Sequence, residues 1–223
     1  RHAATTRDAL TQFGLAKALA ARLGADVFVA EESVGDANGL LGEERDAIAN
    51  AIPRRQAEFA AGRRAARRAL QSLGATDAAI PAGPDRAPIW PQGIKGSITH
   101  DSGLALALVA KAPHVRAVGI DLTEAAPLPG QTRSTILRLD EQHLSDLEAR
   151  AVFAIKETLF KALHPEVKVF FGFDVALVAP DLKGQTFDVQ LCADLGPYPQ
   201  GMQFDGTLIC DDQRIVAALV VTQ

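Results

Sequence analysis

The sequence is poor in cysteine, with only Cys192 and Cys210 among its 223 residues. So sparse a pair argues against a disulfide-stabilised scaffold and is typical of a protein kept in a reducing compartment. The two cysteines also lack the clustered spacing of a zinc site, so we interpret them as buried strand residues. A cytoplasmic location is therefore expected.

Long uncharged apolar stretches are lacking as well. The longest covers residues 104–110, far fewer than the roughly 20 residues that a transmembrane helix requires. The first residues show no signal-peptide pattern, and the chain opens on Arg1 rather than on a methionine. We therefore expect no membrane partner.

Positive charge is in the minority but concentrated. The chain has 23 Lys and Arg against 27 Asp and Glu, a net charge of −4, which argues against general affinity for nucleic acid. Six arginines nevertheless fall in one short span opposed only by Glu58. They are Arg54, Arg55, Arg63, Arg64, Arg67 and Arg68. Such a cluster is ordinarily a solvated helix face, but in an acidic chain it also suggests a compact polyanionic ligand.

Periodicity and turn residues predict both helices and strands. Helices are expected over residues 9–23, 53–73 and 140–163. Strands are expected over residues 26–30, 97–100, 104–110, 115–122, 167–178, 185–192, 204–210 and 214–221. Because the two kinds are segregated rather than strictly alternating, the fold class is α+β. A turn near residues 112–114 divides the chain into halves, residues 1–112 and 113–223.

The helix expected over residues 140–163 carries a polar anomaly. Glu157 and Lys161 lie nearly opposite its apolar stripe, which by itself indicates an exposed ion pair one turn apart. Phe153 and Phe160, however, flank Glu157 on its own side. A helix with large apolar groups on both faces is packed on both, so Glu157 should be partly buried. A buried carboxylate needs a cationic partner or a metal ion.

Asp121 ends an apolar stretch at the close of a predicted strand. Aspartate at the end of a strand is most often a turn former. It could also bind magnesium, which prefers one or two carboxylates together with phosphate oxygens. His100, taken alone, is most often a structural histidine. Local chemistry therefore makes Asp121 and Glu157 a hypothetical Mg²⁺ site and leaves the ordinary interpretations open.

Four segments together resemble a known family. They are Phe59–Leu70, Arg86–Pro91 leading into Gly96–His100, Val118–Asp121 and Phe153–Leu163. In this order they resemble the 4′-phosphopantetheinyl transferase superfamily, in its longer enterobactin synthase component D or surfactin type. The likeness covers roughly residues 54–174.

The resemblance implies a fold and a reaction. It implies two similar α+β halves packed as a pseudo-dimer, with the active site in the cleft between them and a monomer in solution. The enzyme would move the 4′-phosphopantetheine arm of coenzyme A to a serine hydroxyl of an acyl or peptidyl carrier protein. The reaction would require Mg²⁺ and release adenosine 3′,5′-bisphosphate. Siderophore biosynthesis, as in the enterobactin synthase complex, is the common setting of this type.

The resemblance also assigns roles around the metal ion. Asp121 and Glu157 match the metal-binding carboxylates, and Glu157 would also take the proton from the carrier serine. Lys161 would reach a phosphate oxygen. Many relatives carry a second carboxylate two residues after the aspartate, where this chain has Thr123. Since strand alternation points Glu124 to the other face, a water or the Thr123 hydroxyl would complete the coordination.

The nucleotide end of coenzyme A has its own matching residues. By resemblance, Arg63, Arg86 and His100 would hold it, with Thr99 near its 3′-phosphate. Two other readings remain open at this point. One is a catalytically silent homologue that binds coenzyme A or a carrier protein, supported only by Thr123. The other is a nucleic-acid-binding module, which the acidic composition and the lack of interleaved aromatic residues disfavour.

Overall fold

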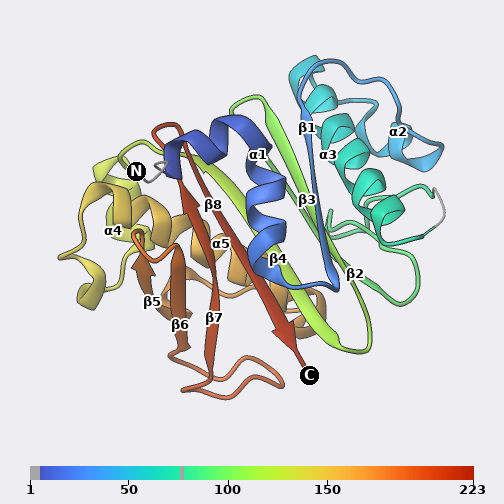
Figure 1. Cartoon of the computed structure of the whole chain (residues 1–223). Coiled ribbons are helices and arrows are strands. Elements are labelled where there is room, and N and C mark those ends of the chain that lie inside the picture. Colours follow the sequence, from blue (N-terminus) through green and yellow to red (C-terminus); the bar gives the residue numbers. More distant parts are fainter. Residues whose placement is uncertain (1–5, 76–77) are drawn as a thin grey trace. The chain divides into compact units, whose positions relative to one another are not determined.

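The computed structural model describes residues 6–75 and 78–223. The chain divides into two compact units, Arg1–Val118 with Thr222–Gln223 and Gly119–Val221. Both contain helices and a sheet, so the α+β fold class is confirmed (Figure 1). Among the described residues, none of the helices combines the length and apolar character that a membrane crossing needs.

The first unit is a sheet covered by helices. Its elements are α1 (Thr6–Leu23), β1 (Val27–Ser33), α2 (Glu43–Ile48), α3 (Pro53–Ser72), β2 (Ile94–Asp101) and β3 (Leu104–Lys111). Within the described residues the sheet has three antiparallel strands in the order β1-β3-β2. The central β3 is buried over seven consecutive positions, and α3 packs against it and against β1.

Small side chains let α3 lie close to this sheet. Ala65, Ala66 and Ala69 are fully buried and share a core cluster with Ala107 and Val109 of β3. Helix α3 begins with Pro53 at its first position, where a missing N–H costs nothing. The expected helix over residues 53–73 and the expected strands over 97–100 and 104–110 are confirmed.

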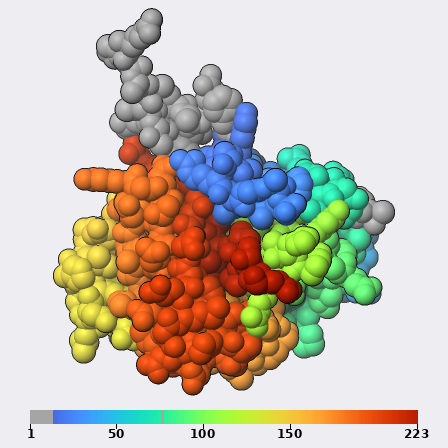
Figure 2. Space-filling model, turned by 60° about the horizontal axis from the view of Figure 1, so that its bottom comes forward, coloured from blue at the N-terminus to red at the C-terminus, as the bar shows by residue number. Residues whose placement is uncertain are grey.

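The second unit is a larger sheet with one long helix. Its elements are β4 (Val115–Glu124), α4 (Gly130–Ile136), η1 (Leu139–Glu141), α5 (Asp146–Val167), η2 (Phe173–Val175), β5 (Ala176–Asp181), β6 (Thr186–Leu191), β7 (Gln203–Cys210) and β8 (Arg214–Thr222). Strand β4 begins in the first unit. In the described chain the sheet order is β4-β8-β7-β6-β5. In Figure 2 the orange and red segments lie side by side, as their antiparallel pairing requires.

The long helix differs from its predicted bounds. It starts at Asp146 because Ser145 caps it: the Ser145 hydroxyl accepts the Glu148 N–H, and the Glu148 carboxylate accepts the Ser145 N–H. It also continues past Pro165, where we expected it to close. The helix instead ends at Val167, and the cap residue Lys168, in a left-handed conformation, donates its N–H to the carbonyl of His164.

Three further expectations about strands were wrong. Residues 167–178 form a helix end, an irregular stretch and η2 before β5, not one strand. Asp121 does not end its strand, since β4 runs on to Glu124. Both cysteines are only half-buried: Cys192 follows β6 and Cys210 is the last residue of β7, so neither belongs to the closed core.

Candidate active site

A glycine brings helix α5 against strand β4. A side chain at Gly119 would collide with the backbone carbonyl oxygen of Thr158 and approach the Cβ of Ala162 to 3.1 Å. The backbone of α5 therefore passes directly over this strand. Because side chains on a strand alternate, Asp121 lies on the same face as Gly119 and is directed at α5.

Asp121 meets a lysine of that helix. Its Oδ1 lies 2.6 Å from Nζ of Lys161, which also donates to the Ile120 carbonyl at 3.2 Å. The aspartate is only 7% exposed. The carboxylate is therefore held in a fixed place with one positive charge beside it.

Glu157 lies one helical turn before Lys161 and is half-buried, as the sequence predicted. Phenylalanines on both sides are packed: the Phe153 ring centroid is 6.2 Å from that of Phe173, and Phe160 is 5.0 Å from Phe171. Burial raises the pKa of Glu157 above the ordinary carboxyl value. The negative charge of Asp121 raises that pKa further, while Lys161 opposes the shift. The ordinary interpretation, an exposed surface pair, is wrong.

These two carboxylates suit a hard divalent cation. The charge of Asp121 disfavours ionisation of Glu157, and Lys161 supplies one positive charge for two negative ones. Magnesium prefers oxygen donors and needs only one or two protein carboxylates besides water and phosphate. In residues 6–75 and 78–223, no cluster of three or more His, Cys, Asp or Glu side chains is arranged for a metal ion. Asp121 and Glu157 are thus the two carboxylates that such an ion could use here.

An arginine occupies the neighbourhood of Thr123. This threonine is 5% exposed, and Nη1 of Arg150 lies 3.4 Å from its hydroxyl oxygen. The same guanidinium donates from Nε to the Ala126 carbonyl at 2.7 Å and from Nη2 to that of Pro127 at 3.1 Å. The place of the missing second carboxylate therefore faces a positive charge.

Sequence reasoning missed Arg150, although a signal was present. It stands seven residues before Glu157 on α5, and residues two turns apart share one face of a helix. Because Arg150 lies on the same helix face as the proposed metal ligand Glu157, it could have been considered as a partner for Thr123. What hid it was the sequence separation of 27 residues between the two partners.

In the first unit, Arg63 is held inside rather than displayed. It is 5% exposed, its Nε donates to the Ile80 carbonyl at 2.6 Å, and its guanidinium carbon lies 4.0 Å from the centre of the Phe59 ring. Burial lowers the pKa of Arg63 to about 10, and the charge of Glu44 opposes this shift. The side chain therefore stays cationic at neutral pH.

His100 lies between a cation and an anion. Its Nε2 accepts from Nη1 of Arg55, and its Nδ1 lies 3.6 Å from Oε2 of Glu58. Because Nε2 accepts this hydrogen bond, the ring proton lies on Nδ1. Thr99, the preceding residue of β2, is buried and points to the opposite face. Arg86 is exposed in a turn with a φ of 65°.

The structure thus assembles part of the predicted site. Asp121, Glu157 and Lys161 come together in the second unit, with Thr123 on the same strand as Asp121. The four residues expected at the nucleotide end belong to the first unit, where Arg63 and His100 each have partners of their own. Their assignment to coenzyme A stays a prediction.

Two neighbouring carboxylates with a lysine beside them could hold a divalent cation and meet phosphate oxygens, which is the chemistry of an enzyme that acts on a phosphate-bearing substrate. Comparison of the sequence with models of known protein families identifies the particular family. Residues 43–110 match the model of the 4′-phosphopantetheinyl transferase N-terminal domain, and residues 117–201 match that of the 4′-phosphopantetheinyl transferase superfamily. The chain belongs to this superfamily and is a 4′-phosphopantetheinyl transferase.

Curated relatives share a large part of the chain. It is similar to 4′-phosphopantetheinyl transferase Svp of Streptomyces mobaraensis, with 36% identity over 75% of this chain and 71% of the relative. For 4′-phosphopantetheinyl transferase Npt of Nocardia iowensis the identity is 34%, over 79% of this chain and 86% of the relative.

The enterobactin-type enzymes that the motifs resembled are more distant. Enterobactin synthase component D of Salmonella typhi is 32% identical over 60% of this chain and 58% of its own length. The predicted superfamily is therefore confirmed. The particular likeness to component D is weaker than the likeness to the transferases of Streptomyces and Nocardia.

Proposed function

We propose that the chain transfers the 4′-phosphopantetheine arm of coenzyme A to a serine hydroxyl of an acyl or peptidyl carrier protein. The reaction uses Mg²⁺ and releases adenosine 3′,5′-bisphosphate. The observation that carries the proposal is the joint placement of Asp121, Glu157 and Lys161 between β4 and α5. This arrangement supplies a place for a divalent cation, a base and a fixed positive charge.

The chemistry is one substitution at phosphorus. The serine oxygen forms a bond to the β-phosphorus that carries the pantetheine, and the bond from that phosphorus to the bridging pyrophosphate oxygen breaks. The leaving group is adenosine 3′,5′-bisphosphate, and the serine proton passes to Glu157, directly or through a water. When bound at Asp121 and Glu157, Mg²⁺ supplies positive charge to the pyrophosphate oxygens.

Lys161 and Glu157 have distinct tasks in this scheme. The ammonium of Lys161 is already fixed at Asp121 by a 2.6 Å ion pair, so it can meet a phosphate oxygen without losing further side-chain freedom. While no cation is bound to it, the raised pKa of Glu157 makes it a stronger proton acceptor than an exposed glutamate. A general base must lie within hydrogen-bond reach of the serine hydroxyl, directly or through one water.

For the nucleotide end we propose Arg63, Arg86, Thr99 and His100. The support is chemical: two guanidiniums, a hydroxyl and an imidazole offer donors suited to phosphate oxygens. His100 accepts a hydrogen bond from Arg55. A phosphate brought to His100 would therefore also meet the Arg55 guanidinium, so that the imidazole and the guanidinium could both donate to it.

Arg63→Lys tests whether the paired donors of the guanidinium matter. A lysine cannot both reach the Ile80 carbonyl and keep planar contact with the Phe59 ring. We expect the KM for coenzyme A to rise about tenfold, which corresponds to ~1.4 kcal/mol, with a smaller change in kcat. Steady-state kinetics with varied coenzyme A measures this. Arg54→Lys, at an exposed position of the same helix, is the control, and equal KM values for both variants would contradict the assignment.

Thr123→Glu tests the altered metal shell. A glutamate there would face the Arg150 guanidinium, which would neutralise part of its charge before any cation is bound. We expect activity to be kept and the Mg²⁺ affinity to be equal to or somewhat higher than that of the wild type. Thr123→Val is the matched control, since it removes the hydroxyl at constant shape and should stay active if water completes the coordination. Complete loss of activity in Thr123→Glu would contradict this account of the metal shell.

The physiological setting is part of the proposal. The relatives named enterobactin synthase component D support siderophore carrier proteins as acceptors, and the enzyme is proposed to act in the cytoplasm as a monomer. The test is mass spectrometry of apo carrier proteins incubated with coenzyme A and Mg²⁺. A mass increase of one phosphopantetheine group on the carrier serine is expected. Retained coenzyme A binding without any such increase on siderophore, polyketide or fatty-acid carriers would contradict the proposed reaction.

A further inference from the structure

A second carboxylate–lysine pair is buried in the same unit, outside the proposed site. Glu141, in η1, is 1% exposed, and Lys156 of α5 is 3% exposed. Oε2 of Glu141 lies 2.6 Å from Nζ of Lys156. Neither residue has a role in the substitution at phosphorus, so the cost of burying two charges needs another explanation.

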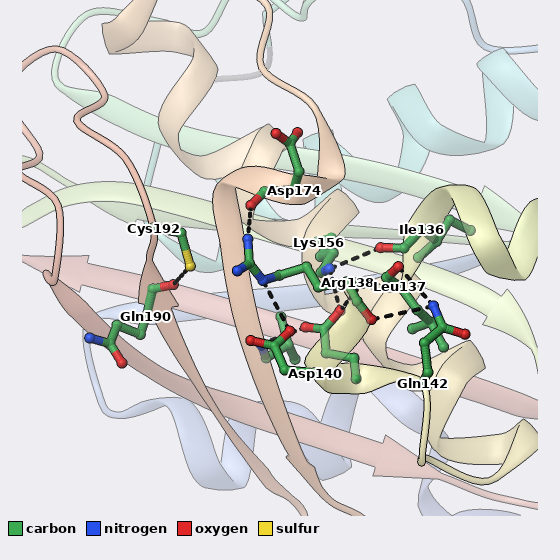
Figure 3. Close-up of polar contacts among 11 residues, drawn as sticks. Ile136, Leu137, Arg138, Asp140, Gln142, Lys156, Asp174, Gln190 and Cys192 are labelled. Atoms are coloured by element: carbon green, nitrogen blue, oxygen red, sulfur yellow. Dashed lines mark hydrogen bonds and ion pairs between the residues drawn. The ribbon is translucent and has the colours of Figure 1, made fainter.

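The pair joins four elements of the unit, η1, α5, β5 and α4. Oε1 of Glu141 accepts the Val178 N–H of β5 at 2.8 Å, and Oε2 also accepts the Arg138 N–H at 2.9 Å. Lys156 donates a second hydrogen bond, at 2.9 Å, to the Ile136 carbonyl at the end of α4. Figure 3 shows Lys156 among Ile136, Arg138 and Asp140. One carboxylate therefore fixes α5 to η1 and to the edge strand β5.

The place of this pair on α5 is its most informative property. Lys156 immediately precedes Glu157, and Lys161 four residues later pairs with Asp121. Two lysine–carboxylate pairs thus lie on either side of Glu157, one to η1 and one to β4. Helix α5 cannot turn about its axis or slide along it without breaking one of them. Buried ion pairs rarely add stability over apolar residues, but they can select one arrangement among several.

We propose that Glu141 is a positioning residue for Glu157. Its pair with Lys156 holds α5 at the rotation and height at which the Glu157 carboxylate faces Asp121. The inference rests on the proposed role of Glu157. It adds a residue that lies outside the four motif segments and touches neither substrate nor metal.

The experiment compares Glu141→Gln, Lys156→Met and the double variant in the full chain. In Glu141→Gln we expect kcat to fall by about 10- to 100-fold and the Mn²⁺ affinity, measured by electron paramagnetic resonance, to weaken. The KM for coenzyme A should change less than kcat. The single variants should also lose thermal stability, since each leaves one buried charge unpaired. Asp140→Asn, at the exposed neighbour paired with Arg138, is the control and should match the wild type.

The double variant separates positioning from stability. With both charges gone, the melting temperature should return toward that of the wild type while kcat stays low. Recovery of kcat together with the melting temperature would overturn the inference, as would a wild-type kcat and Mn²⁺ affinity in Glu141→Gln. If instead the proposed role of Glu157 were wrong, the outcome would be different. In that case Glu157→Gln would itself keep wild-type activity and Mn²⁺ binding.

Discussion

Glu157→Gln should produce an inactive protein that is more stable than the wild type in the absence of metal. The amide cannot accept the serine proton, so kcat should fall by about 10²- to 10⁴-fold from loss of the base alone. The stability gain follows from the carboxylate pair, because Glu157 is half-buried beside Asp121 and its pKa is raised. Transferase kinetics and thermal unfolding in the presence of a chelator measure the two effects.

The pH dependence has a definite sign. A glutamate whose pKa is higher in the folded than in the unfolded state binds protons more tightly when folded. The contribution of Glu157 to the stability of the metal-free wild type is therefore fully present below the unfolded pKa, and it is lost as pH rises through the folded pKa. Glutamine does not ionise, so the variant does not lose this stability. The difference in unfolding free energy between the variant and the wild type should therefore appear toward neutral pH and vanish in acid. Mg²⁺ should stabilise the wild type and not the variant.

Glu148→Gln is the matched control on the same helix. Hydrogen bonds from Ser145 lower the pKa of Glu148, so its contribution to stability is present above the unfolded pKa and lost as pH falls. Glu148→Gln should therefore leave transfer activity unchanged. Near neutral pH it should not raise stability as Glu157→Gln does, and any change should be a loss. If Glu148→Gln raised the stability of the metal-free protein as much as Glu157→Gln, the raised pKa of Glu157 would not explain the gain.

Gly119→Ala should damage both the fold and the site. The added methyl group would meet the Thr158 carbonyl, a backbone atom of α5 that cannot rotate away. Relief requires α5 to move off β4, which should cost about 1–3 kcal/mol of unfolding free energy. The same movement would separate Glu157 and Lys161 from Asp121. A shift of about 1 Å there is expected to lower kcat by roughly 100-fold.

Gly130→Ala is the control for this prediction. It changes glycine to alanine at the first residue of α4, where nothing lies within 4 Å of the added atom. Alanine is the better helix former, so stability should stay equal or rise slightly. Chemical denaturation gives the free energies and single-turnover transfer gives the rates. Wild-type activity in Gly119→Ala would show that the contact of β4 with α5 does not set the site.

The sequence was most informative where local pattern and chemistry agree. The two phenylalanines beside Glu157 predicted its partial burial, and the structure confirms that both rings are packed and that Glu157 is half-buried. The basic helix α3 was also predicted with nearly its observed bounds. The Asp121–Lys161 pair, in contrast, was not foreseen, because its partners are 40 residues apart and meet only through the fold.

What the sequence could not supply were contacts between elements. Arg150 beside Thr123 and Lys156 on Glu141 join residues 27 and 15 positions apart, and no periodicity within one element records such a meeting. The start of α5 was missed for a local reason. Its capping box at Ser145 and Glu148 was present in the sequence but lay inside the span assigned to helix.

The proposed metal site at Asp121 and Glu157 is most directly tested by a Mn²⁺ titration followed by electron paramagnetic resonance. Wild type, Asp121→Asn and Glu157→Gln are compared in the presence of coenzyme A, with Glu148→Gln as control. The account predicts one bound ion per chain in the wild type and the control, and strongly weakened binding in both site variants. Wild-type Mn²⁺ affinity in Asp121→Asn and in Glu157→Gln would contradict it.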